Sequence, residues 1–336
     1  MSLSGYLFED TLVSPTLGRA ADMTFQRSAN RVVTKTFGFR EAMIRLHNQL
    51  MYSMFDECGP FVLKGKDDYL FEGTYIPAVC GENYLGVDRL NHVADSLQFL
   101  DQLLNDHGKK FLFIIAPNKL RYHQNKLDLE CDGVFTNYSE MRQLIHERGI
   151  EMVDFISEFQ GLDHKYPLFS KSGSHWSLYG ASLAAQRIQE KLDDLGVSEG
   201  MLVMTELKVD EYPRKTDKDL HGLLNIVTRP GKEELAYPRL VFEGKRQAKA
   251  LIVGDSYYTM FVYLGIVNEM FAPDSKMLYY NKSVMTTDVN NRGELTEQMR
   301  MNALNDAEVV ILLSNEDAFT TLGWGFMNDA IQALHE

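Results

Sequence analysis

Short apolar runs without polar interruption alternate along most of this chain with segments whose apolar residues recur at helical spacing. An unbroken apolar run suits a strand that is buried on both faces of a parallel sheet. Strands that alternate with helices indicate a parallel sheet covered on both sides, so the pattern predicts an α/β fold with three α/β/α layers. The strands are expected at 111–116, 152–155, 250–253, 277–280 and 309–313, with helices between most of them, for example 138–147 and 179–192.

Residues 1–60 precede this alternation and are predicted to form an extension that packs on a core domain of residues 61–336. Apolar residues recur at helical spacing over 39–55, and Gly59-Pro60 is expected to end that helix. The elements expected next are strands at 61–63 and 69–71, which form a hairpin, and an amphipathic helix over 90–104.

The stretch from about 196 to 247 interrupts the alternation of strands and helices. It is polar and rich in turn residues, with a hairpin expected around 235–242. We therefore predict an insertion into the α/β domain, placed directly before the strand at 250–253.

Composition and charge narrow the choice of partners. The chain has 336 residues, of which 45% are hydrophobic, and this is enough to bury the core of one large α/β domain with additions. Its formal net charge is −13, from 34 basic and 47 acidic residues, and such a surface repels nucleic acid and anionic lipid. No apolar run reaches the roughly 20 residues of a membrane-spanning helix. Nucleic acid is therefore not expected as a partner.

The cysteines and the start of the chain bear on its location. Cys58, Cys80 and Cys131 do not have the spacing of a zinc site, so neither a metal nor a cofactor is expected. Their odd number is no disulfide framework, although a Cys58–Cys80 bridge stays open. The opening Met1-Ser2-Leu3 is typical of residues added in cloning, so a native signal or anchor segment is expected to have been removed.

A serine follows the apolar run at 250–253, in Gly254-Asp255-Ser256. Ligands of parallel α/β sheets bind beyond the carboxyl ends of the strands, so this serine is a candidate nucleophile. The backbone N–H groups of Ser256 and Tyr257, at the start of the next helix, are candidates for holding an oxyanion. The alternative is that Asp255 and Ser256 only cap that helix.

A serine is a weak nucleophile unless a base takes its proton, and the candidate base is His175. It lies in the glycine- and serine-rich segment 172–177, ahead of a helix. The alternative is a structural loop histidine that packs against Trp176. Asn315, two residues past the last apolar run, is a candidate oxyanion donor, or else a cap or turn residue.

Three further residues are candidate substrate contacts. Asn118 and Lys119 follow the run at 111–116 through Pro117, and Trp176 adjoins the candidate base. A lysine in this position is by default a surface charge. Its place at the end of a strand makes it a candidate for binding substrate.

These pieces, in this order, resemble the SGNH hydrolase-like acetyltransferases typified by the alginate O-acetyltransferases of the bacterial periplasm. The hairpin at 62–71 is similar to the family's "GKDGWLF" segment, with Asp68 where glycine is usual. The other similar segments are 37–41, at the family's entry helix, 113–119 ("viaPnK"), 153–155 ("vvDl"), His175-Trp176 with Gly180 ("DxHW…G"), and the nucleophile block 253–256.

The resemblance implies an SGNH-like (flavodoxin-like) three-layer fold in which the order of the motifs is circularly permuted, with the histidine ahead of the serine. It implies Ser256 as nucleophile, His175 as general base and Asn315 as oxyanion donor. The implied activity is that of an O-acetyltransferase or acetylesterase acting on a cell-surface or secreted carbohydrate. The implied partners are a carbohydrate polymer or oligosaccharide, an acetyl donor and a membrane-bound acetyl-transfer protein, in the periplasm or outside the cell.

One position departs from the family pattern. Where the family has the aspartate that orients the histidine, this chain has Gly173. Three outcomes are open. A carboxylate from elsewhere, such as Asp163 or Asp317, orients the imidazole; a backbone carbonyl or a water does so; or the protein is a non-catalytic glycan-binding or scaffold protein on the same fold.

Overall fold

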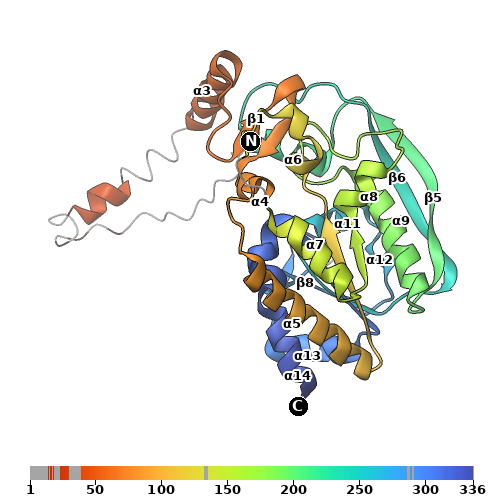
Figure 1. Ribbon diagram of the computed structural model, residues 1–336. Helices are drawn as coiled ribbons and strands as arrows, with labels where there is room; N and C mark the ends of the chain where they lie inside the picture. Colours follow the sequence, from red (N-terminus) through yellow and green to blue (C-terminus); the bar gives the residue numbers. More distant parts are fainter. Residues whose placement is uncertain are drawn as a thin grey trace.

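The computed structural model describes residues 14, 16, 18, 23–29, 39–131, 135–285, 288, 289 and 291–335. Its centre is a seven-stranded sheet with the strand order β10-β9-β8-β7-β11-β3-β4 (Figure 1). The five strands from β8 to β4 in this order are parallel, and all five were predicted from the apolar runs. The strands are β3 (Lys110–Ala116), β4 (Met152–Asp154), β7 (Ala250–Gly254), β8 (Lys276–Tyr279), β11 (Val309–Asn315) and the antiparallel edge strands β9 (Ser283–Met285) and β10 (Arg292–Glu294).

Helices cover both faces of the sheet, which confirms the predicted layers. Successive side chains of β3 point to opposite faces, so Leu112 and Ile114 pack in one apolar core while Phe111 and Phe113 pack in the other. The first core lies beneath α8 (Phe155–Gly161), α9 (Leu178–Asp194), α11 (Thr259–Leu264) and α12 (Val267–Met270). The second core lies beneath α5 (Val87–Asp106), α7 (Asn137–Glu147), α13 (Glu297–Asp306) and α14 (Phe326–His335).

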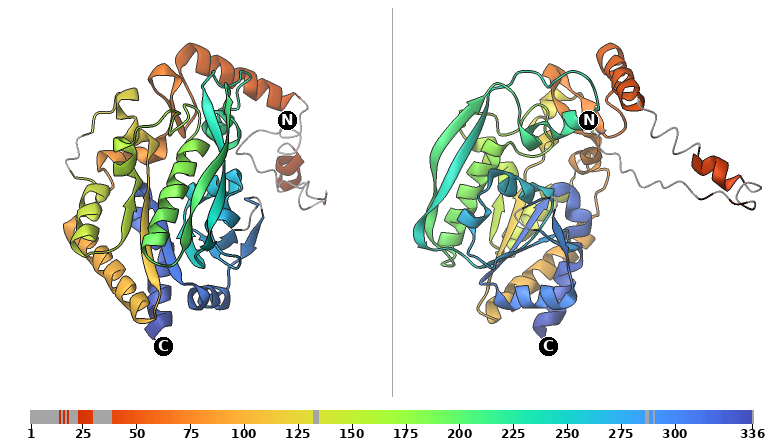
Figure 2. Two further views of the ribbon diagram at one scale, coloured as in Figure 1. Left: turned by 90° about the vertical axis from the view of Figure 1, so that its right-hand side faces the viewer. Right: turned by 180° about the vertical axis from the view of Figure 1, so that it is seen from behind.

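Ahead of the sheet, the chain forms α3 and the predicted hairpin at one end of the molecule (Figure 2). In the turn of the hairpin, Asp67 and Asp68 have positive φ angles of 57° and 62°. That conformation favours glycine, and in this chain two aspartates adopt it. The elements of this part are α3 (Arg40–Phe55), β1 (Val62–Lys64), η1 (Lys66–Asp68), β2 (Leu70–Glu72), η2 (Gly73–Tyr75) and α4 (Ile76–Cys80).

The disulfide pairing differs from the one left open by the sequence. Cys80, at the end of α4, is bonded to Cys131, and the Cα atoms of the pair are 4.8 Å apart. Cys58 is a free, half-buried thiol. The bond ties α4 to the segment that follows the short elements α6 (Lys119–Tyr122) and η3 (Gln124–Lys126).

The predicted insertion contains a long two-stranded ribbon, seen along the right-hand side of Figure 1. Strands β5 (Glu199–Asp210) and β6 (Leu235–Arg246) pair antiparallel and pack on α9. The hairpin expected at 235–242 is therefore wrong, because these residues belong to one continuous strand whose partner lies earlier in the chain. The segment between the strands contains η4 (Lys215–Lys218) and α10 (Asp219–Leu223). In the described part of the chain, no helix is both long and apolar enough to cross a bilayer.

Candidate active site

The predicted serine and histidine meet at the carboxyl end of β7. Ser256 opens the 3₁₀ turn η5 (Ser256–Tyr258), two residues after β7 ends, and His175 lies in the loop before α9. Nε2 of His175 is 2.8 Å from Oγ of Ser256, although 81 residues separate them in sequence. This is the distance of a hydrogen bond between a nucleophile and its base.

A carboxylate binds the other nitrogen of the imidazole. Oδ2 of Asp219 is 3.0 Å from Nδ1 of His175, and Oδ1 of Asp219 accepts the backbone N–H of Ser174 at 2.8 Å. With the Nδ1 proton directed at Asp219, Nε2 is free to accept the proton of Ser256. The arrangement is that of a serine–histidine–aspartate triad.

Asp219 replaces the acid that the sequence lacks at position 173. A Cβ atom at Gly173 would lie 2.8 Å from the carbonyl oxygen of Thr216, so the backbone of the inserted segment fills the space that an aspartate would need. The two aspartates suggested from the sequence do not take this role. Asp163 is exposed, and Asp317 donates its N–H to Oδ1 of Asn315. No motif spacing pointed to Asp219, which begins the short helix α10 inside the insertion.

The charges around His175 suit a base. Burial by itself would lower the pKa of His175, but the hydrogen bond and charge of Asp219, with the charges of Asp255 and Glu72, raise that pKa above its ordinary value. The protonated ring that forms when His175 takes a proton is thus stabilised. The ring also lies edge-on to Tyr257, with ring centroids 4.9 Å apart.

Asp255 ties the serine turn to the neighbouring strand. Its Oδ1 accepts the N–H of Tyr257 at 3.0 Å and its Oδ2 accepts the N–H of Asn315 at 2.7 Å. Burial raises the pKa of Asp255 to about 6. Since the N–H of Tyr257 is already bonded to Asp255, the predicted role of that N–H in holding an oxyanion is not supported by its geometry.

Tyr280, which the sequence analysis missed, lies on the other side of the serine. Its N–H donates to the carbonyl of Gly254 at 2.9 Å, and its hydroxyl lies near Ser256, whose hydrogen-bonding groups act to lower the pKa of Tyr280. Burial raises the pKa of Tyr280, so its hydroxyl keeps a proton to donate. Tyr280 has a φ of +50°, and its ring packs edge-on to Trp324, whose φ is +48°. Such backbone strain is held in place by the structure around it.

The other candidates are less exposed to substrate than expected. Trp176 is buried and donates its indole N–H to the carbonyl of Tyr257 at 3.2 Å. Asn118 and Asn315 are both buried, and the side chain of each accepts a backbone N–H in the turn that it caps. Asn315 is the last residue of β11, and η6 (Glu316–Gly325) follows it. Among the described residues, Nδ2 of each asparagine has no hydrogen-bond partner.

Lys119 is not the surface charge that its position in the sequence suggested. Its side chain is 2% exposed, and Nζ donates to the carbonyls of Leu70, Lys171 and Gly173. All three protons of the ammonium group thus have protein acceptors, so the structure gives Lys119 no direct contact with a bound substrate. The structure brings together Ser256 and His175, with Asn315 on the neighbouring strand, but not Lys119.

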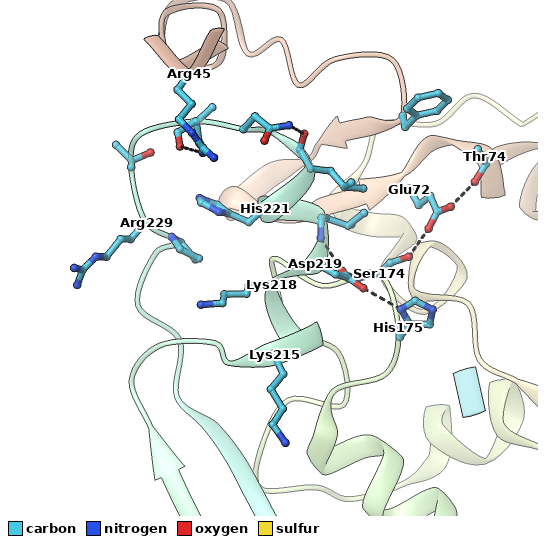
Figure 3. A pocket seen from close by; sticks show the side chains of 18 residues that line it. Arg45, Glu72, Thr74, Ser174, His175, Lys215, Lys218, Asp219, His221 and Arg229 are labelled. Atoms are coloured by element: carbon cyan, nitrogen blue, oxygen red, sulfur yellow. Dashed lines mark hydrogen bonds and ion pairs between the residues drawn. The ribbon is translucent and has the colours of Figure 1, made fainter. Parts of the chain in front are cut away.

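A cleft of about 830 Å³ opens beside His175 and Asp219, as Figure 3 shows. Glu72 lies in the same wall and accepts the hydroxyl proton of Ser174 at 2.6 Å. Helix α3 contributes Arg45, which donates to the carbonyl of Ile226 at 3.5 Å. The cleft also has four cationic side chains in its lining, although the chain as a whole is acidic: Arg45, Lys215, Lys218 and Arg229. His221 lines it too, and burial lowers the pKa of that imidazole. Among the residues that the structure describes, no group of three or more metal-binding side chains is placed to hold an ion.

The fold is similar to solved structures of acetyltransferases. The O-acetyltransferase domain of Pseudomonas putida AlgJ superposes with a TM-score of 0.51 at 17% identity, over 77% of this chain and 92% of that one. Bacillus cereus PatB1 with a sulfonyl adduct superposes with a TM-score of 0.51 at 12% identity, over 79% and 97%. These likenesses concern the fold, which is SGNH-like as expected.

The amino-acid sequence is also similar to sequences of O-acetylases. The chain is 25% identical over 157 residues to the probable alginate O-acetylase AlgJ of Pseudomonas aeruginosa, which is 46% of this chain and 39% of that protein. It is 25% identical over 141 residues to the protein of the same name from Pseudomonas syringae pv. tomato, of which 35% is covered. The chain thus spans less than half the length of these relatives. The family model "SGNH hydrolase-like domain, acetyltransferase AlgX" matches residues 62–259, more than half of the chain, and the protein belongs to this family of SGNH hydrolase-like acetyltransferase domains.

Proposed function

We propose that the protein transfers or removes O-acetyl groups on a carbohydrate, using Ser256, His175 and Asp219. The observation that carries the proposal is the unbroken chain of contacts from Oγ of Ser256 through the imidazole to the carboxylate, at 2.8 and 3.0 Å. The alternative, a glycan-binding protein without activity, was based on the missing acid at position 173. Asp219 supplies an acid to His175 from another segment, so that argument no longer supports the alternative.

The reaction proceeds in two halves. Oγ of Ser256 attacks the carbonyl carbon of the acetyl donor while Nε2 of His175 takes the hydroxyl proton, and Asp219 stabilises the imidazolium that forms. Collapse of the tetrahedral intermediate breaks the bond to the donor, and His175 protonates the leaving group. A sugar hydroxyl then attacks the acetyl-serine and gives its proton to His175. The acetyl group passes to the sugar, and Oγ of Ser256 recovers the proton.

The oxyanion of each tetrahedral intermediate forms beside Ser256. The donors proposed for it are the N–H of Ser256, as predicted from the sequence, the hydroxyl of Tyr280, and the buried amide of Asn315, which also lies beside the hydroxyl of Tyr257. Donors fixed in advance around the developing charge are a large part of catalysis in acyl transfer. If water replaces the sugar hydroxyl as acceptor, the same groups act as an esterase.

The cleft supports an acidic glycan as acceptor. Four cationic side chains and two carboxylates line it, so the cleft carries a local positive charge in a protein of net charge −13, and such local charge attracts an anionic chain. The relatives are named alginate O-acetylases. We expect Lys218→Glu and Arg229→Glu to raise KM for an acidic oligosaccharide, more at low than at high salt, and Lys208→Glu, exposed on β5, to leave KM unchanged. If Lys218→Glu and Arg229→Glu had the same KM as Lys208→Glu, the proposal of an acidic glycan as substrate would be contradicted.

The proposed location is the periplasm or the outside of the cell, and it is supported by the Cys80–Cys131 disulfide. Disulfides persist in oxidising compartments and are rare in the cytosol. There the acetyl donor is proposed to reach Ser256 from a membrane-bound transfer protein, as the family resemblance implies.

The proposal is tested with an activated acetyl ester, p-nitrophenyl acetate, with and without an oligosaccharide acceptor. We expect turnover and an acetyl group on Ser256 detectable by mass spectrometry, both lost in Ser256→Ala and kept in Ser96→Ala, on the surface of α5. Acetylated oligosaccharide identifies a transferase, and acetate alone an esterase. Absence of Ser256-dependent turnover together with oligosaccharide binding would show a binding protein instead.

A further inference from the structure

Lys119 is a buried ammonium group with three backbone acceptors. Its Nζ donates to the carbonyl oxygens of Leu70 at 2.7 Å, Lys171 at 2.9 Å and Gly173 at 2.7 Å. An ammonium group has three protons, so the three carbonyls use its full capacity. All three of these acceptors are backbone groups.

Two of these acceptors belong to the loop that carries the catalytic base. Lys171 and Gly173 precede His175 by four and two residues, and their carbonyls converge on one nitrogen atom. The third acceptor, Leu70, lies on β2 and also donates its N–H to the carbonyl of Lys171 at 2.8 Å. Lys119 therefore joins the start of α6, β2 and the histidine loop at a single point.

The inserted segment holds the opposite side of the same loop. Oδ1 of Asp219 accepts the N–H of Ser174, and the carbonyl of Ser172 accepts the N–H of His221 at 3.2 Å. Gly173 thus has Lys119 on its carbonyl, and the carbonyl oxygen of Thr216 occupies the space where a Cβ atom would lie. The loop is fixed between the two, with the His175 ring directed at Ser256.

A charge in this position has an energetic cost. Removing an ammonium group from water is unfavourable unless its donors are satisfied. Burial lowers the pKa of Lys119 to about 7, although the charges of Asp219, Glu233 and Asp217 act to raise it. A methionine would avoid the cost of burying a charge, but it would leave the carbonyl of Gly173 without the donor that Lys119 supplies.

We propose that Lys119 is a positioning residue for acetyl transfer: its ammonium group curls the segment 171–175 so that His175 meets Asp219 and Ser256 at once. The inference rests on the proposed function, because it concerns the same triad. Lys119 touches neither substrate nor the reacting atoms, and acts only through the carbonyls of Lys171 and Gly173.

The test compares Lys119→Met with Lys165→Met, whose exposed ammonium group lies earlier in the same connection, over the ring of Tyr166. Two readouts are used: kcat and KM for p-nitrophenyl acetate, and the rate at which phenylmethylsulfonyl fluoride modifies Ser256, which needs no acetyl acceptor. We expect Lys119→Met to lower kcat and the modification rate by about 10²-fold, the loss typical of a misplaced catalytic group, while KM changes little. Lys165→Met should keep both rates.

Folding is monitored by thermal unfolding, and a purely structural role would lower Tm without changing kcat of the folded protein. Two further variants are used in case Lys119→Met does not fold. Lys119→Gln fills the space and keeps two donors. Lys119→Ala is assayed with methylammonium chloride and, as its control, with sodium chloride. Recovery of the modification rate by methylammonium alone supports the proposal. A folded Lys119→Met or Lys119→Gln with unchanged kcat and modification rate would overturn it. If the proposed function itself is wrong, the wild-type protein will show no Ser256-dependent turnover, and this result is distinct from an effect of the Lys119 variants.

Discussion

The carbonyl oxygen of Thr216 stands so close to Gly173 that a Cβ atom there would lie 2.8 Å from it. The family's aspartate position and the inserted segment therefore compete for the same space in this protein. The segment that occupies the space also supplies Asp219, whose carboxylate takes over the contact to Nδ1 of His175.

The first prediction concerns restoring the family residue. Gly173→Asp should lower both stability and activity, because the new side chain collides with the backbone of Thr216 and Asp217 and displaces Asp219. Overpacking of this kind costs about 1–3 kcal/mol, measurable by urea unfolding. Gly161→Ala is the matched control, since a Cβ atom at Gly161 meets no atom within 4 Å. A rise in kcat of Gly173→Asp would show that His175 lacks a partner in the native protein.

The second prediction concerns Asp219→Asn. Loss of the orienting acid should lower kcat by up to about 10⁴-fold, the effect of the equivalent change in a serine protease. Asp163→Asn and Asp317→Asn should leave kcat within about threefold of wild type, since neither carboxylate contacts His175 and a change of that size is less than one kcal/mol. Equal losses in all three variants would argue against Asp219 as the acid.

The pH profile provides a third test, because His175 must be unprotonated to act as base. The pKa of His175 is raised, so activity should rise with pH through a limb above the ordinary histidine value of about 6.5. Asp219→Asn should move this limb to lower pH. For stability the sign is opposite: the protonated ring adds stability below the unfolded-state pKa, and this is lost as pH rises through the folded-state pKa. A limb that does not move in Asp219→Asn would refute the assignment.

The fourth prediction separates the two buried asparagines. Asn315→Ala should lower kcat by about 10²–10³-fold if its amide holds the oxyanion. Asn118→Ala is the matched control, because Asn118 also caps a turn and its Nδ2 likewise lacks a partner among the described residues. Both variants should lose about 1 kcal/mol from the missing cap, seen in thermal unfolding, but only Asn315→Ala should lose kcat.

The fifth prediction concerns the disulfide. The bond closes a loop of 51 residues, and its removal by Cys80→Ser with Cys131→Ser should cost about 4 kcal/mol by the chain-entropy argument. Tm of the wild type should fall in reductant, and Tm of the double variant should not respond. Cys58→Ser is the control and should leave the redox response of Tm intact, since Cys58 is a free thiol. A reductant-independent Tm in the wild type would contradict the pairing.

The sequence predicted the sheet and the Ser256–His175 pair better than the rest of the site. Apolar runs identify buried strands because burial on both faces leaves no polar positions, and the carboxyl ends of parallel strands gather at one edge. Asp219 could not be found this way. It follows His175 by 44 residues and begins the short helix α10. Its role depends on the segment between β5 and β6 lying against the histidine loop, which no local pattern predicts.

Lys119 and α3 show a second limit of reading the sequence. A lysine after a strand is ordinarily solvated, and only the convergence of three carbonyls from distant segments explains its burial. The amphipathic pattern of α3 correctly predicted a helix, but Met43, Leu46 and Leu50 are exposed, and the helix meets the cleft wall through polar side chains such as Asn48 and Gln49. Periodicity identifies an apolar face without identifying what it contacts.

The exchange of positions between Gly173 and Asp219 sets a condition on any hybrid of this protein with its relatives. A graft that brings in a relative's own loop with aspartate at 173 would clash with the resident segment, and a graft that deletes residues 215–219 would leave the imidazole without its acid. The loop with Gly173 and the segment 215–219 are far apart in sequence, but a hybrid must take both from the same parent protein.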